Sequence, residues 1–127
     1  MNIEERSKPI KKEIATEMVN AYAKEAKGKP SYTKAAWFPA EQIIQIAETL
    51  KDGKHDGLRI YLAQYTVDSL DGLPKEYLGR NTVLLVPTLA ADLTGGLGDP
   101  TDGQTDDTGL IENRGDLCPS MCSGTEL

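Results

Sequence analysis

The charge of this 127-residue chain is concentrated in its last quarter. Residues 1–93 carry thirteen Asp or Glu and thirteen Lys or Arg, whereas residues 94–127 carry seven acids and one base, Arg114. Residues 94–127 also hold seven of the twelve glycines and no aromatic residue. Such a segment cannot build its own core, because it has too few apolar side chains to offset the entropy of ordering the chain. We therefore predict one domain, with an α+β body over residues 1–93 and an acidic tail bearing Gly, Asp and Cys over residues 94–127 that packs on the body.

The composition excludes several classes of protein. A hydrophobic fraction of 39% and a charged fraction of 27% are typical of soluble globular domains. A net charge of −6 disfavours binding to a nucleic-acid backbone, which needs clustered Lys and Arg. No apolar run approaches the ~20 residues that span a bilayer, and residues 1–12 lack the apolar core of a signal peptide. We predict a cytoplasmic protein that binds neither nucleic acid nor membrane.

Apolar spacing predicts two amphipathic helices. Over residues 9–26, apolar side chains recur every three or four positions, which is the period of one helix face. A second helix follows Pro39 and ends at the Lys-Asp-Gly of residues 51–53, with one apolar face made of Ile43, Ile44, Ala47 and Leu50.

Three segments read as strands, over residues 33–38, 57–65 and 81–88. The last is apolar on both faces, which favours a central place in a sheet. The predicted fold class is α+β, with two amphipathic helices packed on one face of a small, mainly antiparallel sheet, followed by a long irregular acidic C-terminal segment. We expect Trp37 and Phe38 to lie in the core, and residues 74–78 to form a short helical turn.

Four carboxylates lie within nine residues of the tail. Calcium prefers six to eight oxygen ligands, which carboxylates interleaved with Gly and Thr can supply. The spacing does not match an EF-hand loop, so a soluble acidic loop is the simpler interpretation. The candidate metal ligands are Asp99, Asp102, Asp106 and Asp107.

The two cysteines, Cys118 and Cys122, admit several interpretations. We expect two reduced thiols packed against the body, because a reducing compartment disfavours disulfides. The alternatives are a zinc site, a disulfide that acts as a thiol switch, and a cysteine nucleophile activated by His55. Each is less supported, since zinc needs four ligands and His55 is expected to be a lone exposed loop histidine.

Arg59, Tyr61 and Tyr65 share one side of the strand over residues 57–65. Arg and Tyr are frequent at interface hot spots, so this row is a candidate binding surface. The alternative that we favour is that the tail covers the row, with Arg59 paired to one of the tail's acids.

Four short motifs resemble a group of small uncharacterised bacterial proteins. They are Trp-Phe-Pro at 37–39, Arg-Ile-Tyr at 59–61, the strand that ends in Val-Pro-Thr at 86–88, and Gly-x-Leu-Cys-Pro-x-x-Cys at 115–122. The resemblance covers roughly residues 35–122 and implies that body and tail form one unit. It carries no activity across.

No pattern of catalytic residues stands out in the sequence, so an enzyme is the less favoured interpretation. We expect a small soluble binding or accessory protein that acts through protein–protein contacts, with a protein partner or self-association and no cofactor. The alternatives are a metal-binding protein, with calcium at residues 99–107 or zinc at the cysteines, and a thiol-based switch or enzyme that uses Cys118 and Cys122.

Overall fold

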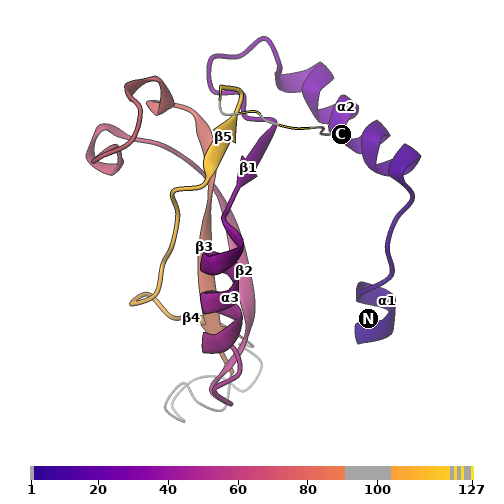
Figure 1. Ribbon diagram of the computed structural model, residues 1–127, viewed down its shortest axis with the longest axis vertical. Coiled ribbons are helices and arrows are strands. Elements are labelled where there is room, and N and C mark those ends of the chain that lie inside the picture. Colours follow the sequence, from indigo (N-terminus) through magenta and orange to yellow (C-terminus); the bar gives the residue numbers. More distant parts are fainter. Residues whose placement is uncertain (1, 91–103, 121, 123, 125–126) are drawn as a thin grey trace.

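The structure, a computed structural model, describes residues 2–90, 104–120, 122, 124 and 127. Figure 1 shows an upright pair of long strands with one helix beside them and a second helical arm that stands apart. The helices are α1 (Ile3–Arg6), α2 (Lys12–Ala26) and α3 (Ala40–Thr49). The strands are β1 (Ala35–Trp37), β2 (His55–Gln64), β3 (Asn81–Leu89), β4 (Thr105–Asp106) and β5 (Asp116–Cys118). This content confirms the α+β class.

The strands form two sheets instead of the single sheet expected. One has the order β2-β3-β4 and the other pairs β1 with β5, and every pairing is antiparallel. The central position of β3 is confirmed, and residues 75–77 form the short helical turn predicted there. The first predicted strand pairs with neither β2 nor β3, because its partner is β5 from the C-terminal segment.

The C-terminal segment is part of both sheets. β4 pairs with the end of β3, Glu112 forms an isolated bridge with Leu85, and β5 pairs with β1. These pairings were not foreseen, because strands of two or three residues carry no periodic signal. They tie residues 104–118 to elements that lie tens of residues earlier.

The buried core lies where β5 passes over the end of β2. Tyr65, Tyr77 and Leu117 form a cluster, and the two tyrosine rings stack with their centroids 5.7 Å apart. Leu117 is 0% exposed, and its backbone N–H donates to the Tyr77 hydroxyl over 3.0 Å. Leu110 and Ile111, two other apolar residues of the same segment, are exposed.

Buried Arg80 joins three segments of the chain, and nothing in its sequence context predicts this role. Its Nε donates to the carbonyl of Tyr32 over 2.8 Å, and its terminal nitrogen donates to the carbonyl of Pro119. The two bonds hold the connector before β1 and the turn after β5 against the start of β3.

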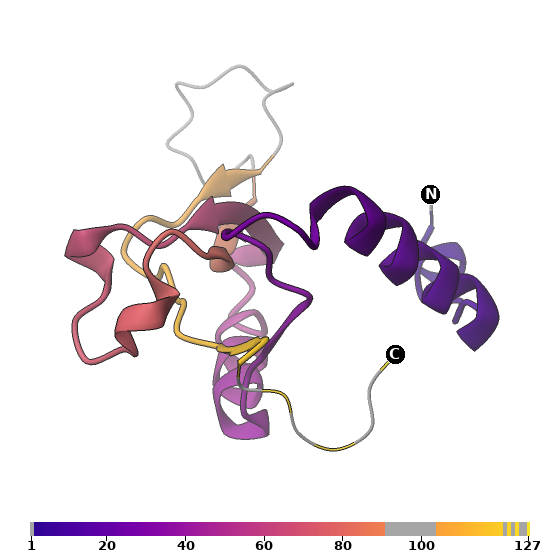
Figure 2. The ribbon, with the colours of Figure 1, turned by 90° about the horizontal axis from the view of Figure 1, so that it is seen from above.

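The two helices differ in how they pack. α3 is anchored by buried Ile46 and by Gln42, whose side-chain nitrogen donates to the Glu112 carboxylate over 3.0 Å. α2 stands away from the strands in both Figure 1 and Figure 2, and Ile14, Met18 and Tyr22 on its apolar stripe are exposed. The expectation that both helices pack on one sheet face therefore needs correction for α2.

The two neighbouring aromatic residues before α3 differ in how far they are buried. Phe38 is half-buried and packs so closely on Gly115 that a side chain there would lie 2.8 Å from the ring. Trp37, in contrast, is 61% exposed, so its predicted burial is wrong. Alternation along β1 explains the exposure, because Ala36 is the residue that points inward toward Leu117 and its neighbours.

Candidate interaction face

β2 has two unlike sides, and together they make the candidate site. Arg59 and Tyr61 point to one side, whereas Ile60 and Leu62 point to the other. The first side is occupied by the C-terminal segment. The second carries exposed apolar side chains, with Leu62 at 89% exposure.

On the first side, Asp106 of β4 bridges Arg59 and Tyr61. One carboxylate oxygen accepts from the Arg59 guanidinium over 2.6 Å, and the other accepts from the Tyr61 hydroxyl. The predicted pairing of Arg59 with an acid of the tail is confirmed. The third member of the predicted row, Tyr65, is 3% exposed in the core and offers no binding surface.

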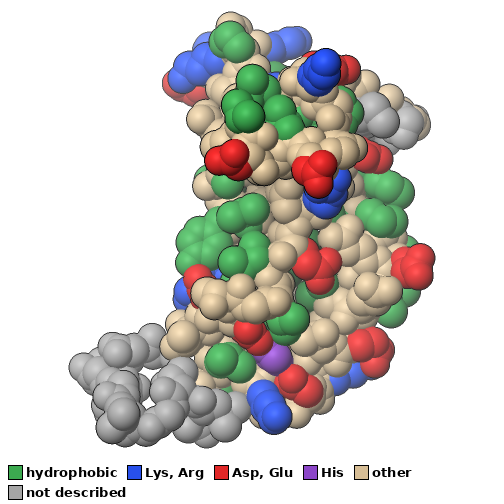
Figure 3. Space-filling view, turned by 90° about the vertical axis from the view of Figure 1, so that its left-hand side faces the viewer, with side chains coloured by type: hydrophobic (Ala, Val, Ile, Leu, Met, Phe, Trp, Pro, Cys, Tyr) green, Lys and Arg blue, Asp and Glu red, His purple; other side chains and the backbone are tan. Residues whose placement is uncertain are grey.

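At the start of β2, His55 joins two carboxylates in what we call the His55 clamp (Asp52, His55, Asp107). Its Nδ1 lies 2.8 Å from Asp52 and its Nε2 lies 2.8 Å from Asp107. The side chain of His55 is 7% exposed, so the expectation of a lone exposed loop histidine is wrong. Figure 3 shows the imidazole low on the molecule among Asp and Glu side chains.

The clamp changes the acid–base behaviour of its members. Hydrogen bonds to Asp107 and then to Asp52 raise the pKa of His55, because a carboxylate favours the imidazolium form. The bond with His55 lowers the pKa of Asp107. Backbone N–H groups of His55 and Lys54 donate to Asp52 and lower its pKa to about 2.

These contacts bear on the predicted metal site. Asp106 turns to Arg59 and Tyr61, and Asp107 turns to His55, so the two carboxylates do not converge. Asp99 and Asp102 lie outside the described residues. Across residues 2–90 and 104–120 and the few described positions beyond them, no group of three or more His, Cys, Asp or Glu is placed to hold a metal ion.

The cysteines are joined to each other. Cys118 and Cys122 form a disulfide, so the expectation of two reduced thiols is wrong. A cysteine nucleophile paired with His55 is also excluded in this state. Both ring nitrogens of His55 face carboxylates at the lower end of β2, whereas β5 lies at the upper end in Figure 1.

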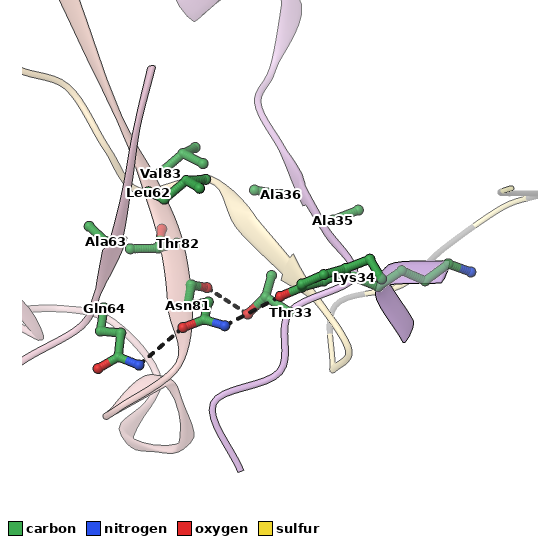
Figure 4. A pocket seen from close by; sticks show the side chains of 11 residues that line it. Thr33, Lys34, Ala35, Ala36, Leu62, Ala63, Gln64, Asn81, Thr82 and Val83 are labelled. Carbon is green, nitrogen blue, oxygen red and sulfur yellow. Dashed lines mark hydrogen bonds between the residues drawn. The ribbon is translucent and has the colours of Figure 1, made fainter. Parts of the chain in front are cut away.

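The second side of β2 borders an open groove of about 740 Å³, the apolar groove (lined by residues 33–36, 62–64 and 81–83 and by Tyr22). Figure 4 shows Leu62 and Val83 side by side on neighbouring strands at one end. At the other end Gln64 donates to the Asn81 side chain over 3.2 Å, and Thr33 donates to the Asn81 carbonyl over 2.5 Å. One end of the groove is therefore polar and hydrogen-bonded, whereas the end at Leu62 and Val83 is apolar.

Sequence reasoning missed this groove, although one signal was available. Leu58, Ile60 and Leu62 alternate along the strand, which places all three on the side opposite Arg59 and Tyr61. With α2 standing apart, Ile60 and Leu62 stay exposed.

Comparison with protein-family models, with curated proteins and with solved structures finds no match to this chain. The resemblance to small bacterial proteins stays a prediction. No helix among the described residues is both long and apolar enough to cross a membrane.

Proposed function

We propose that this chain is a small binding or accessory protein that acts through protein–protein contacts. The observation that carries the proposal is the exposed apolar side of β2 beside the apolar groove. Ile60 and Leu62 are exposed on the same side of β2, and Leu62 also lines the groove, so apolar side chains gather beside a concave surface, as they do at many protein-binding sites.

The arrangement supports binding in two ways. Among the described strands, β2 lies at the edge of its sheet, so its backbone polar groups on that side can pair with another chain. The Asp106 bridge and the His55 clamp hold the opposite side of β2 to the C-terminal segment, so the strand that presents the surface is braced from behind. We place the protein in the cytoplasm, as its sequence suggests.

The test is site-specific photo-crosslinking in cells. A benzophenone amino acid at position 62 is expected to give a discrete adduct with a protein, because Leu62 projects from the proposed surface. The matched control is position 67, since Val67 is also an exposed apolar residue and does not line the groove. Absence of an adduct at position 62, or equal labelling at both positions, would contradict the proposal.

The Cys118–Cys122 disulfide favours one second candidate, a thiol switch. A dithiol would reduce the disulfide to two thiols and itself become a disulfide, the two electrons and two protons passing to Cys118 and Cys122. Because Cys118 is the last residue of β5 and follows buried Leu117, reduction is expected to loosen residues 116–118 and speed their cleavage by protease. Cleavage at an unchanged rate would rule the switch out.

A further inference from the structure

One wall of the apolar groove is held in place by the strand that ends in the disulfide. Residues 33–36, which we call the β1 wall, belong to β1 and the connector before it, and they face residues 62–64 and 81–83 across the groove (Figure 4). Among the described strands, β1 forms no ladder with β2 or β3. Its partner is β5, and Ala35 lies opposite Cys118 in that ladder. The position of the β1 wall therefore depends on β5.

A direct hydrogen bond joins the β1 wall to the disulfide. The backbone N–H of Lys34 donates to the carbonyl of Cys118 over 2.7 Å. Cys118 is the last residue of β5 and is also one partner of the disulfide with Cys122. The acceptor of this hydrogen bond thus lies at the point where the ladder ends and the disulfide loop, residues 118–122, begins.

Buried Arg80 gives an indirect link between the disulfide loop and both walls. Its guanidinium donates to the carbonyl of Pro119, inside the loop, and to the carbonyl of Tyr32 over 2.8 Å. Tyr32 directly precedes the β1 wall, and Arg80 directly precedes Asn81 of the opposite wall. A buried guanidinium that loses an acceptor keeps an unsatisfied N–H group, which is costly. Displacement of the Pro119 carbonyl is therefore expected to disturb the residues next to both walls.

We propose that the Cys118–Cys122 disulfide regulates the apolar groove, and that its reduction releases the β1 wall. A groove with one wall free to move must order that wall when a partner binds, and this cost lowers the affinity. The oxidised chain is then the form that binds well, and the reduced chain binds weakly. The inference rests on the proposed function, because it names how binding at that same surface is controlled.

The chemistry is thiol–disulfide exchange with a dithiol. Cys122 is exposed whereas Cys118 is only 6% exposed, so a thiolate from solvent reaches the Cys122 side of the bond more readily. Its attack breaks the S–S bond, forms a mixed disulfide with Cys122 and releases Cys118, which takes up a proton. The second thiol of the dithiol then displaces Cys122 and closes the reagent's own disulfide. Two electrons and two protons pass to the two cysteines.

The first experiment measures hydrogen exchange of single backbone amides by NMR in the full chain, before and after reduction with dithiothreitol. The Lys34 amide is expected to exchange about tenfold faster after reduction, because its acceptor is the Cys118 carbonyl. The matched control is the Leu85 amide, which donates to the Glu112 carbonyl in the same C-terminal segment, before β5. Unchanged exchange at Lys34, or an equal increase at both amides, would overturn the inference.

Cys122→Ser separates loss of the disulfide from other effects of the reagent. This chain cannot close the loop, so its Lys34 amide is expected to exchange rapidly with or without dithiothreitol. Slow exchange at Lys34 in this variant would show that the ladder between β1 and β5 holds the wall without the disulfide. That result would also overturn the inference.

The second experiment asks whether release of the β1 wall changes binding. Purified oxidised wild type and Cys122→Ser, each with a benzophenone amino acid at position 62, are photolysed in a cell extract. The thiols of the extract are first alkylated and the reagent removed, so that the extract does not reduce the disulfide. Leu62 lies on the wall opposite the β1 wall, so the probe itself is not displaced. The yield of the protein adduct is expected to fall severalfold in Cys122→Ser.

The outcomes also separate this inference from the proposed function. If position 62 gives equal adducts in the two chains, the regulation is wrong and the proposed function stands. If neither chain gives an adduct, the proposed function is wrong, and so is the inference that rests on it.

Discussion

Residues 104–118 and helix α2 contrast in pattern and in packing. α2 has an apolar stripe and good helix formers, yet Ile14, Met18 and Tyr22 stay exposed. Residues 104–118 are polar and rich in turn formers, yet they supply strands to both sheets and also Leu117, the most completely buried side chain among the described residues. A strong local pattern decides that an element forms, whereas its burial depends on non-local partners.

The largest expected effect comes from Leu117→Ala. This side chain is fully buried against Tyr65 and Tyr77, so truncation is expected to cost about 2–5 kcal/mol of unfolding free energy through lost transfer and cavity formation. Met18→Ala in α2 is expected to change it by about 0.5 kcal/mol or less, as an exposed substitution does. Urea unfolding of both variants at micromolar concentration measures the difference. Equal losses of unfolding free energy would contradict the contrast between residues 104–118 and α2.

A somewhat smaller effect is expected for Arg80→Met. The guanidinium donates to the carbonyls of Tyr32 and Pro119, and two hydrogen bonds from a charged group at about 1.5 kcal/mol each suggest a loss of about 3 kcal/mol. Methionine keeps much of the buried volume, so the loss reports on the two bonds. An Arg80→Met chain as stable as the wild type in urea would show that the C-terminal turn does not depend on Arg80.

Reduction of the disulfide is expected to cost about 2 kcal/mol, because opening a loop of only five residues returns little entropy to the unfolded chain. Unfolding with and without a reducing agent gives the value, and Cys122→Ser is the control that should not respond to the agent. Treatment of intact cells with a thiol-alkylating agent, with no reducing agent present, tests localisation. Fully alkylated cysteines would support the cytoplasmic assignment, and a protected pair would contradict it.

The smallest effect is a pH dependence from the His55 clamp. The pKa of His55 is raised in the folded state. Its contribution to the free energy of unfolding is therefore fully present below about pH 6.5 and is lost as pH rises through the folded pKa. Asp52 and Asp107 have lowered pKa values, so their contribution is present above about pH 3.8 and is lost as pH falls through the folded values. Stability is therefore expected to be greatest between these two limits.

The matched variant is His55→Gln, which keeps a hydrogen-bonding side chain without a titrating ring. The melting temperature of the wild type is expected to fall between pH 6 and pH 9, and that of His55→Gln should fall less. Parallel curves for the two proteins would mean that the clamp contributes nothing to the pH dependence.

Much of the fold could be predicted because its larger elements carry strong local periodicity. The helix predicted over residues 9–26 is Lys12–Ala26, and the predicted strands at 57–65 and 81–88 are His55–Gln64 and Asn81–Leu89. α1 was missed, although Asn2 caps it by accepting a hydrogen bond from the N–H of Glu5 over 2.9 Å. A four-residue helix is too short to show an apolar repeat.

Only one contact of the candidate site could be predicted from the sequence, and it is a pairing of opposite charges. Opposite charge paired Arg59 with the tail, and Asp106 is that partner. The predicted row wrongly included Tyr65. The alternation of side chains was extended one residue past Gln64, where β2 ends, and Tyr65 is buried in the core. His55 looked isolated because its second carboxylate, Asp107, lies 52 residues further along the chain.

The pairing of β1 with β5 also sets the order in which a newly made chain can be completed. Ala36 faces Leu117, so eighty residues are synthesised between these two partners. Until β5 has left the ribosome, β1 has no partner strand, and Tyr65 and Tyr77 lack the side chain that seals them. Chains that end before residue 116 should therefore be digested readily by protease, and the released 127-residue chain should resist.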